Sequence, residues 1–231
     1  GIPAASSSVG SKGSIAIFEE TSSVGGLWNR DPRRTRQTVP CTCRDPESSA
    51  ATITVPSSSQ PVYEFLTANF FKDMSGFTDH PFPPHVKFFP SPEEVESYHQ
   101  GYATLHELQN AIHFDTLVEK CWKERREDGD IWNIQVKRTG RDGKKRPVVF
   151  QSKRVLVCTG NFRKAFVPDV RGLRHFQGEL RHSSAFQTPK HFHEKSVLIV
   201  GGGVSGHDIA GVLSRYGTCR RIVVSVRQWK G

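Results

Sequence analysis

Two short apolar runs flank a glycine-rich segment at the end of the chain and give its clearest pattern. Residues 196–200 and 221–226 have the continuous apolar composition of strands. Residues 207–216 lie between them, mix apolar and polar positions as a helix does, and are followed by Gly217. This order predicts a strand, a helix and a second strand within about 30 residues, the unit from which parallel sheets are built.

Another helix is predicted to begin at Ser91, where three signals coincide. Ser91 can cap the helix, Pro92 suits its first position, and Glu94 completes a capping box. Apolar residues then recur at steps of three and four positions, which predicts a face buried in the core. These residues are Val95, Tyr98, Tyr102, Leu105, Leu108 and Ile112.

The middle of the chain predicts a β-meander. The segments 117–122, 131–136 and 147–150 are predicted strands, separated by charged turns that contain glycine. Residues 154–158 form a further apolar run, which is predicted to be a buried strand that leads into Thr159 and Gly160.

The first part of the chain predicts the remainder of a second strand–helix–strand unit. Residues 14–18 are predicted to be a buried parallel strand that ends at the acidic residues Glu19 and Glu20. Gly25 and Gly26 then predict a tight turn. Residues 31–61 are rich in Pro, Ser, Thr and Arg and show no periodicity, so they are predicted to be a loop.

Composition narrows the class of protein only in part. The chain has 231 residues and a formal net charge of +9, which suits a nucleic acid, an anionic membrane or a phosphate-bearing cofactor. Its 5 cysteines form no Cys-x-x-Cys pair, so we expect neither a disulfide framework nor a metal site. No apolar run approaches about 18 residues, so we expect no membrane-spanning helix and no signal segment.

The glycine-rich segment has the spacing Gly201-x-Gly203-x-x-Gly206, which is typical of dinucleotide binding when it follows a strand and opens a helix. Gly201 permits a tight turn, Gly203 lets a pyrophosphate approach the backbone, and Gly206 lets the helix pack closely on the strand. The helix N-terminus then offers free N–H groups to the phosphates. We predict a dinucleotide site that includes Ser205 of the same turn; the alternative is a glycine-rich turn without a ligand.

The end of the following strand indicates which dinucleotide binds. Val226 and Arg227 stand about 20 residues after Gly206, where an acidic residue would hold the ribose 2′-hydroxyl of NAD. A guanidinium instead pairs with a 2′-phosphate, so we predict that this half binds NADPH. The alternative is that Arg227 is an ordinary exposed arginine.

The start of the chain shows the complementary pattern. If Gly1 is the last glycine of a second, truncated fingerprint, Glu19 stands at the end of the next strand, where an acid holds an unphosphorylated ribose. This arrangement implies a second dinucleotide that lacks a 2′-phosphate. The alternative is that Glu19 is a solvated surface residue.

With these motifs, the chain resembles the flavin-containing monooxygenases over nearly its whole length. Residues 18–28 are similar to the family's segment after its first fingerprint, and residues 63–74 resemble the stretch that ends in an active-site Asn and a Met. The most specific match is a signature just before the second fingerprint. It consists of Phe176, Gly178, His182 and Phe186.

The resemblance implies an NADPH- and O2-dependent flavin monooxygenase that transfers one oxygen atom to a soft nitrogen or sulfur of a small molecule. It implies that NADPH reduces FAD and that a C4a-hydroperoxide of the flavin carries the oxygen. Asn69 would lie near the flavin and the nicotinamide, and His182 and Phe186 would be structural supports. The implied FAD-binding residues are Gly1, Glu19, Gly25, Gly26, Leu27, Trp28, Thr159 and Gly160, and the NADP(H)-binding residues are Gly201, Gly203, Ser205, Gly206 and Arg227.

The predicted fold class is α/β, with two Rossmann-like dinucleotide-binding domains of the three-layer FAD/NADP type and a β-meander. Both domains are expected to be incomplete: residues 1–168 as a partial FAD-binding domain with a truncated N-terminal fingerprint, and residues 169–231 as the start of the NADP(H)-binding domain. The expected partners are a small nitrogen- or sulfur-containing substrate and O2, with no nucleic acid and no membrane segment. The expected location is intracellular, either cytoplasmic or associated with the endoplasmic reticulum.

Departures from the family pattern leave alternatives open. Phe71 replaces a proline that is common in the family, and the missing glycines before Gly1 allow a catalytically inactive fragment that binds NADP(H). Phe186 disfavours a Baeyer–Villiger monooxygenase, since that group usually carries Trp at this position. A disulfide reductase would need a redox pair of cysteines.

Overall fold

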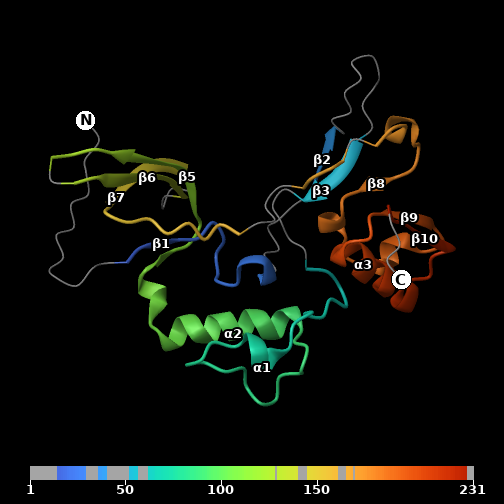
Figure 1. The fold of residues 1–231 in the computed structure, drawn as a ribbon, viewed down its shortest axis with the longest axis horizontal. Helices are drawn as coiled ribbons and strands as arrows, with labels where there is room; N and C mark the ends of the chain where they lie inside the picture. Colours follow the sequence, from blue (N-terminus) through green and yellow to red (C-terminus); the bar gives the residue numbers. More distant parts are fainter. Residues whose placement is uncertain are drawn as a thin grey trace. The chain divides into compact units, whose positions relative to one another are not determined.

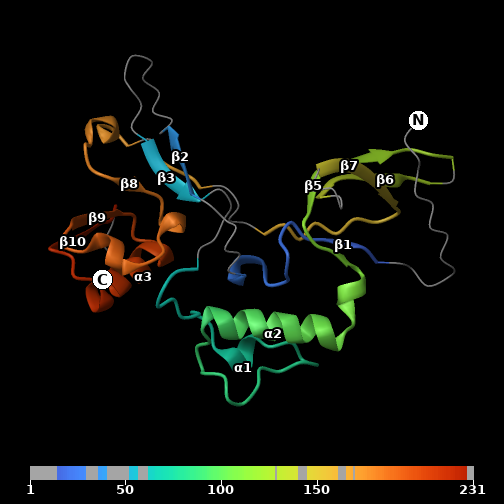
Figure 2. The same cartoon turned by 180° about the vertical axis from the view of Figure 1, so that it is seen from behind.

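The computed structural model describes residues 15–29, 36–40, 52–56, 62–127, 129–139, 145–160, 165–168 and 170–227. The chain divides into two compact units, each built from segments that are distant in the sequence. Figures 1 and 2 show the helices and strands from two opposite sides. The first unit comprises Gly1–Gly25 and Glu96–Gly160, and the second comprises Gly26–Val95 and Asn161–Gly231. Gly1, one of the predicted cofactor-binding residues, lies outside the described residues.

An antiparallel sheet in the first unit confirms the predicted β-meander. Strands β5 (Thr116–Glu124), β6 (Ile131–Thr139) and β7 (Lys145–Ser152) pair in the order β5-β6-β7. The strands extend beyond the predicted apolar runs, because charged residues continue the ladder at their ends. Ile134 and Val136 of the central strand are buried, so β6 provides the core of this sheet.

The strand predicted at residues 14–18 is shorter and more exposed than expected. Strand β1 (Ile17–Phe18) pairs in parallel with β4 (Ile112–His113), over two residues only. Ile15 is 72% exposed, so the expectation of a buried strand is wrong here. Parallel strands are buried when other elements cover both faces of their sheet. A sheet with only two paired residues is too small for such covering, so the predicted strand is not buried along its length.

Helix α2 (Pro92–Leu105) begins where the sequence predicts, and its capping box is formed. The Ser91 N–H donates to Glu94 Oε2 (2.7 Å), and the Glu94 N–H donates to Ser91 Oγ (3.3 Å). Both groups would otherwise be unpaired donors near the helix N-terminus. Val95 and Tyr98 are 1% and 5% exposed, which confirms the first part of the predicted buried face.

The end of helix α2 corrects the prediction, because the apolar pattern continues past it. Glu107 has a left-handed backbone (φ 52°), a conformation that cannot continue a right-handed helix. Leu105, the last residue of α2, is 55% exposed. Leu108 falls in the 3-10 helix η2 (Leu108–Asn110), and Ile112 belongs to β4.

A small sheet in the second unit corrects the prediction of a loop over residues 31–61 at residues 36–40 and 52–56, and the rest of that span lies outside the described residues. Strands β2 (Arg36–Pro40) and β3 (Thr52–Pro56) pair antiparallel, and β3 also pairs in parallel with β8 (Leu180–Arg181). Ile53 and Val55 are each 6% exposed, whereas Thr52 is exposed, as in a strand with one buried face. This alternation is too short to stand out in a segment rich in Pro and Ser.

The predicted strand–helix–strand unit is confirmed at the end of the described chain (orange and red in Figure 1). Strands β9 (Ser196–Val200) and β10 (Arg221–Ser225) are parallel neighbours, and helix α3 (Val204–Tyr216) connects them. The helix begins at Val204 rather than at residue 207, so Gly206 lies within its first turn.

The larger of two buried clusters in the described part of the second unit packs helix α3 against this sheet, and the other surrounds Ile53 and Val55 of β3. Leu213 of α3 is 1% exposed and belongs to one cluster with Tyr63 and Phe186, whose rings meet edge to face at 5.1 Å between centroids. Among the described residues nothing covers the opposite face of the sheet, where Leu198 and Val200 are 61% and 62% exposed. Phe186, the last residue of the signature, thus belongs to the cluster that packs against α3.

Short helices complete the described elements: η1 (Gly26–Trp28), α1 (Lys72–Ser75), η3 (Leu173–His175), η4 (Ser183–Ala185) and η5 (Pro189–Phe192). Residues 154–158, predicted to be a buried strand, form no strand, and Leu156 and Val157 are 88% and 75% exposed. A strand needs a hydrogen-bonded neighbour, and no described residue provides one here.

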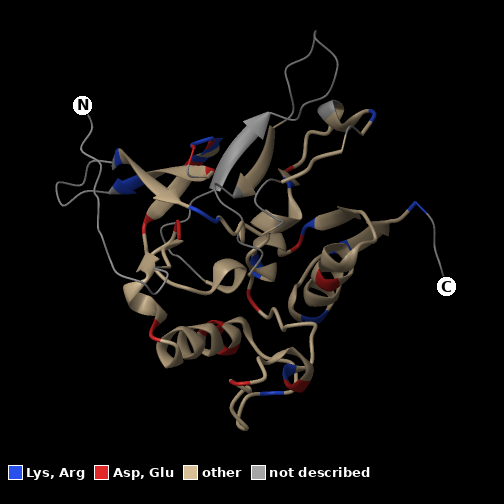
Figure 3. Ribbon diagram, turned by 60° about the vertical axis from the view of Figure 1, so that its left-hand side comes forward, with Lys and Arg blue, Asp and Glu red and all other residues tan. Residues whose placement is uncertain are grey.

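Charge is interspersed along the described elements rather than separated by sign (Figure 3). No helix in the described ranges is long and apolar enough to cross a membrane. Within the same ranges, no three His, Cys, Asp or Glu side chains are grouped so that they could hold a metal ion.

Candidate functional site

The three glycines of the fingerprint, two in the turn between β9 and α3 and one in the first turn of α3, lie in three different settings. Gly201 has a φ of 116°, in the region that favours glycine, and its N–H donates to Ser225 O (2.9 Å) at the end of β10. A Cβ on Gly206 would collide with Gly201 O, so the helix and the turn approach as closely as bare backbone allows. A Cβ on Gly203 would meet nothing within 4 Å and would project into open space.

This turn leads directly into the N-terminus of α3. Gly203 is the N-cap, and no side chain caps the helix. The N–H groups at the start of the helix therefore donate to no capping side chain. An open depression lies at this point, lined by Gly202, Val204, His207 and Asp208. Burial raises the pKa of the Asp208 carboxyl group. The positive end of the helix dipole and the free N–H groups favour an anion here.

His207 is a residue of this depression that the sequence reasoning did not single out. Its Nδ1 lies 3.2 Å from Gly203 O, so the imidazole folds back over the turn. The glycine spacing predicts a role for the backbone and says nothing of the side chains nearby. The one sign of His207 in the sequence is its position directly after Gly206.

Arg227 lies at the same edge of the sheet as the glycine turn. Because β9 and β10 are parallel and in register from Ser196–Arg221 to Val200–Ser225, their carboxyl ends meet. Val226 reaches the turn, since a Cβ on Gly202 would lie 2.5 Å from Val226 Cγ1. Arg227 follows directly and is exposed. The structure therefore brings together the residues predicted to bind NADP(H), namely Gly201, Gly203, Ser205, Gly206 and Arg227.

Glu19 is fixed at the end of β1 in the first unit. Its backbone N–H donates to His113 O (3.0 Å), which keeps it in line with the short parallel pair. Its Oε1 accepts hydrogen bonds from Thr21 N–H (2.8 Å) and from Thr21 Oγ1 (2.7 Å). Glu19 is half-buried, so the carboxylate has a defined direction rather than the freedom of a solvated side chain.

The predicted glycine turn is present, and its part in the second unit, Gly26–Trp28, contacts the residue that follows Asn69. Gly25 and Gly26 have positive φ values of 126° and 54°. The ring of Trp28 meets the ring of Phe70 edge to face, with 5.8 Å between centroids. Asn69 precedes Phe70 and its side chain is exposed. The structure thus brings the turn at Gly26–Trp28 beside the predicted active-site asparagine.

Thr159 and Gly160 end the described part of the first unit. Both residues are exposed, and Gly160 has a φ of 71°. They follow the apolar run that forms no strand, so their backbone groups do not lie at a strand end. They belong to the same unit as Glu19.

His182 of the signature connects three segments of the second unit. Its N–H donates to Thr54 O (3.0 Å) in β3, and its Nδ1 accepts from Ser184 N–H (3.2 Å). Burial lowers the pKa of the imidazole, and a hydrogen bond with the Phe166 backbone opposes this shift. Burial therefore favours the neutral ring, which suits a residue that accepts at one nitrogen and donates at the other.

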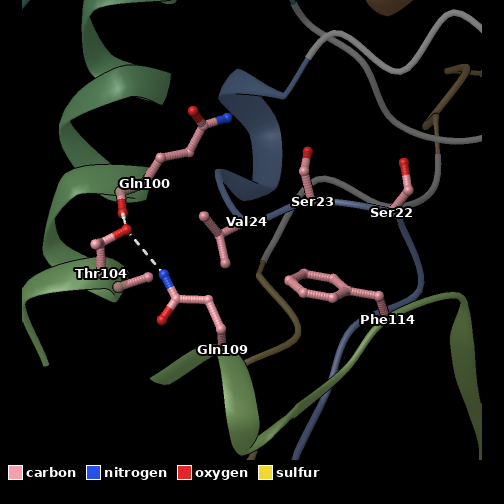
Figure 4. Close-up of a pocket in the computed structure, with 8 residues that line it drawn as sticks. Ser22, Ser23, Val24, Gln100, Thr104, Gln109 and Phe114 are labelled. Atoms are coloured by element: carbon pink, nitrogen blue, oxygen red, sulfur yellow. Dashed lines mark hydrogen bonds between the residues drawn. The ribbon is translucent and has the colours of Figure 1, made fainter. Parts of the chain in front are cut away.

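A cavity of about 180 Å³ lies within the first unit beside the loop that follows Glu19, and no motif pointed to it. Ser22 and Val24 line it from the loop, and Gln100 and Thr104 line it from helix α2 (Figure 4). Thr104 Oγ1 donates to Gln100 O (2.9 Å) and lies 2.8 Å from the Gln109 amide. The only signal in the sequence was the helical spacing of these polar residues.

A parallel strand–helix–strand unit with a bare glycine turn at its carboxyl edge defines the Rossmann-like class of nucleotide-binding proteins. The family described as "Flavin-binding monooxygenase-like" matches residues 54–230, which is more than half of the chain. The chain therefore belongs to the flavin-binding monooxygenase-like family.

Relatives of known name support this assignment. Flavin-containing monooxygenase 5 of Oryctolagus cuniculus is 31% identical over 216 residues, which cover 91% of this chain and 35% of that protein. Dimethylaniline monooxygenase (N-oxide-forming) 4 of Homo sapiens is 32% identical over 215 residues, which cover 91% of this chain and 33% of that protein. The chain thus spans about a third of the length of these two relatives.

The fold is similar to that of a solved enzyme, the S-allyl-L-cysteine S-oxygenase from Allium sativum. The TM-score is 0.70 at 25% sequence identity, over 94% of this chain and 46% of that chain. The chain has the α/β fold of the flavin monooxygenases, with Rossmann-like nucleotide-binding regions and a β-meander.

Proposed function

We propose that this protein is an NADPH- and O2-dependent flavin monooxygenase that transfers one oxygen atom to a soft, nucleophilic nitrogen or sulfur of a small molecule. The observation that carries the proposal is the position of Arg227 at the edge of a bare glycine turn, where a guanidinium suits a 2′-phosphate. The relatives named as flavin-containing and dimethylaniline monooxygenases support the same class of reaction.

The residues of the second unit suit NADPH. The open space at Gly203 leaves room for a pyrophosphate beside the backbone, and the uncapped N–H groups at the start of α3 can bind it. Arg227 would hold the 2′-phosphate, and Ser205 would contribute its N–H from the first helical turn. On this proposal, residues 169–231 contribute to the NADP(H)-binding domain.

The residues of the FAD side suit a nucleotide without a 2′-phosphate. Thr21 orients the Glu19 carboxylate so that it can accept a hydrogen bond from a ribose hydroxyl. The remaining positions would offer backbone groups to FAD, and residues 1–168 would contribute to its domain. These positions are Gly1, Gly25, Gly26, Leu27, Trp28, Thr159 and Gly160.

Bound FAD supplies the redox chemistry, since a flavin can take hydride from NADPH and pass electrons to O2. One NADPH, one proton, one O2 and one substrate give NADP⁺, one water and the oxygenated product. The protein holds the two nucleotides and limits the access of water. We propose that the Asn69 amide contacts the flavin and the nicotinamide, because its side chain is exposed beside the turn at Gly26–Trp28.

The test is an assay of the whole protein purified with FAD. We expect a yellow protein whose NADPH consumption rises with a thioether or a tertiary amine, and which forms the sulfoxide or the N-oxide. A colourless protein that ignores NADPH contradicts the proposal. Conversion of a cyclic ketone to a lactone without heteroatom oxidation would identify a Baeyer–Villiger enzyme, and NADPH binding without turnover would identify an inactive binding protein.

The substitution Gly203→Ala is expected to weaken NADPH binding about tenfold and to leave stability nearly unchanged, because a methyl group there would displace the phosphates from charge-assisted hydrogen bonds. Gly203 has a φ of −79°, which alanine adopts, and its Cβ would meet nothing within 4 Å. Calorimetric titration and thermal melting measure the two quantities. An unchanged NADPH affinity would show that no phosphate approaches Gly203.

A further inference from the structure

Lys72 is a buried lysine whose ammonium group is surrounded by backbone carbonyls. It is 6% exposed, although lysine is among the residues most often found at the surface. The three acceptors of its Nζ are Pro83 O (3.2 Å), Pro84 O (3.1 Å) and Val86 O (2.6 Å). An ammonium group has three N–H donors, so these carbonyls use all of them.

The three carbonyls belong to residues 83–90, which we call the strap. The strap is also tied to the segment that carries Asn69 by two backbone hydrogen bonds. The Ala68 N–H donates to Pro90 O (2.8 Å), and the Lys72 N–H donates to Phe88 O (3.0 Å). Asn69 lies between these two bonds, and its own side chain remains exposed. Its backbone is therefore held on both sides by the strap, whose other end is held by the Lys72 ammonium group.

Aromatic packing reinforces the same connection. The ring of Phe71 stacks on that of Phe88, with 5.2 Å between centroids and 9° between planes, and it meets Phe89 edge to face at 6.0 Å. These ring contacts of Phe71 join the strap to the Asn69 segment.

We infer that Lys72 is the positioning residue for Asn69: its ammonium group fixes the strap, and the strap fixes the backbone on both sides of Asn69. This inference rests on the proposed function, in which the Asn69 amide contacts the cofactors. The donor geometry is specific to lysine, because an arginine presents its donors in a planar fork and cannot direct three of them at carbonyls that converge on one point.

The first experiment measures hydrogen–deuterium exchange in the whole protein and needs no turnover. Lys72→Met removes the three donors and keeps a side chain of similar length. Lys87→Met is the matched control, since Lys87 is an exposed lysine of the strap. We expect the Ala68 and Lys72-position amides to exchange about tenfold faster in Lys72→Met, because local opening becomes easier, and to be unchanged in Lys87→Met. Equal protection in both variants overturns the inference.

The second experiment measures uncoupling, the ratio of hydrogen peroxide released to NADPH consumed with a thioether substrate. We expect this ratio to rise about tenfold in Lys72→Met, since a misplacement of about 1 Å in a positioned group can cost a factor of about 100. If Lys72 acts through Asn69, the double variant with Asn69→Ala is no more uncoupled than Asn69→Ala alone. Additive effects of the two substitutions contradict a positioning role.

A third variant covers the case in which Lys72→Met does not fold. Lys72→Arg keeps the charge and part of the hydrogen bonding, and we expect faster exchange and greater uncoupling in the same direction. Wild-type values in both experiments overturn the inference. A wild-type protein that binds FAD but oxygenates nothing contradicts the proposed function instead, while the exchange experiment still decides whether Lys72 holds the Asn69 segment.

Discussion

NADPH affinity is expected to fall about 10- to 100-fold when Arg227 is replaced by alanine, because a hydrogen bond to a charged group contributes about 1.5–3 kcal/mol. NADH affinity should change little, since NADH has no 2′-phosphate for the guanidinium to hold. Arg227 follows β10 at the edge where the glycine turn lies, and it is exposed. Salt screens an exposed ion pair, so the difference between the two cofactors should be largest at low ionic strength.

Arg221→Ala is the matched control for this substitution. Arg221 begins β10 opposite Ser196, at the far end of the same strand, and its loss changes the net charge of the protein by the same amount. Calorimetric titration of each variant with NADPH and with NADH, at two salt concentrations, gives the comparison. Equal losses for the two cofactors, or equal effects of Arg227→Ala and Arg221→Ala, would show that Arg227 does not read the 2′-phosphate.

The elements that could be predicted from the sequence are those specified by neighbouring residues. The start of helix α2 follows from Ser91 and Glu94, whose reciprocal hydrogen bonds span three positions. Strands β9 and β10 follow from short apolar runs on either side of a glycine turn. The start of α3 was predicted too late, because Gly206 is a poor helix former and only its close approach to Gly201 places it inside the first turn.

The elements that could not be predicted depend on partners that are distant in the sequence. Strand β3 exists because it pairs with β2 on one side and with β8, more than 120 positions later, on the other. Residues 154–158 are apolar enough for a strand, yet no described segment pairs with them. Helix α2 ends at Leu105, and the left-handed backbone of Glu107, two residues later, is not encoded by any breaker residue. Local patterns carry none of this information.

The same distinction applies to the candidate site. Glycine spacing and the end of β10 pointed to the glycine turn and Arg227 as a candidate nucleotide site, because the chemistry of each position is visible in the sequence. The contact between Trp28 and Phe70 joins two segments that are distant in the chain, and no spacing could indicate it. Lys72 looked like any surface lysine, since only the fold shows that three carbonyls surround its ammonium group.

A methyl group on Gly206 is expected to destabilise the protein, whereas a methyl group on Gly211 should stabilise it. Both glycines lie in helix α3, so alanine gains about 1 kcal/mol of helix propensity at either position. A Cβ on Gly206 would collide with Gly201 O and lie 3.6 Å from Ile199 Cγ2, and overpacking of this kind costs about 1–3 kcal/mol. A Cβ on Gly211 would meet nothing within 4 Å.

The difference between the two variants isolates the contact between helix and turn, because their propensity gains cancel. Urea denaturation without cofactor should give a free energy of unfolding that is about 1–3 kcal/mol lower for Gly206→Ala than for Gly211→Ala. NADPH affinity should also fall in Gly206→Ala alone, since the helix must move away from Gly201 and carry its N–H groups with it. Equal stability and equal NADPH affinity of Gly206→Ala and Gly211→Ala would contradict this prediction. Such a result would show that the turn can move away from the helix without cost, and that the close contact between Gly206 and Gly201 does not shape the phosphate site.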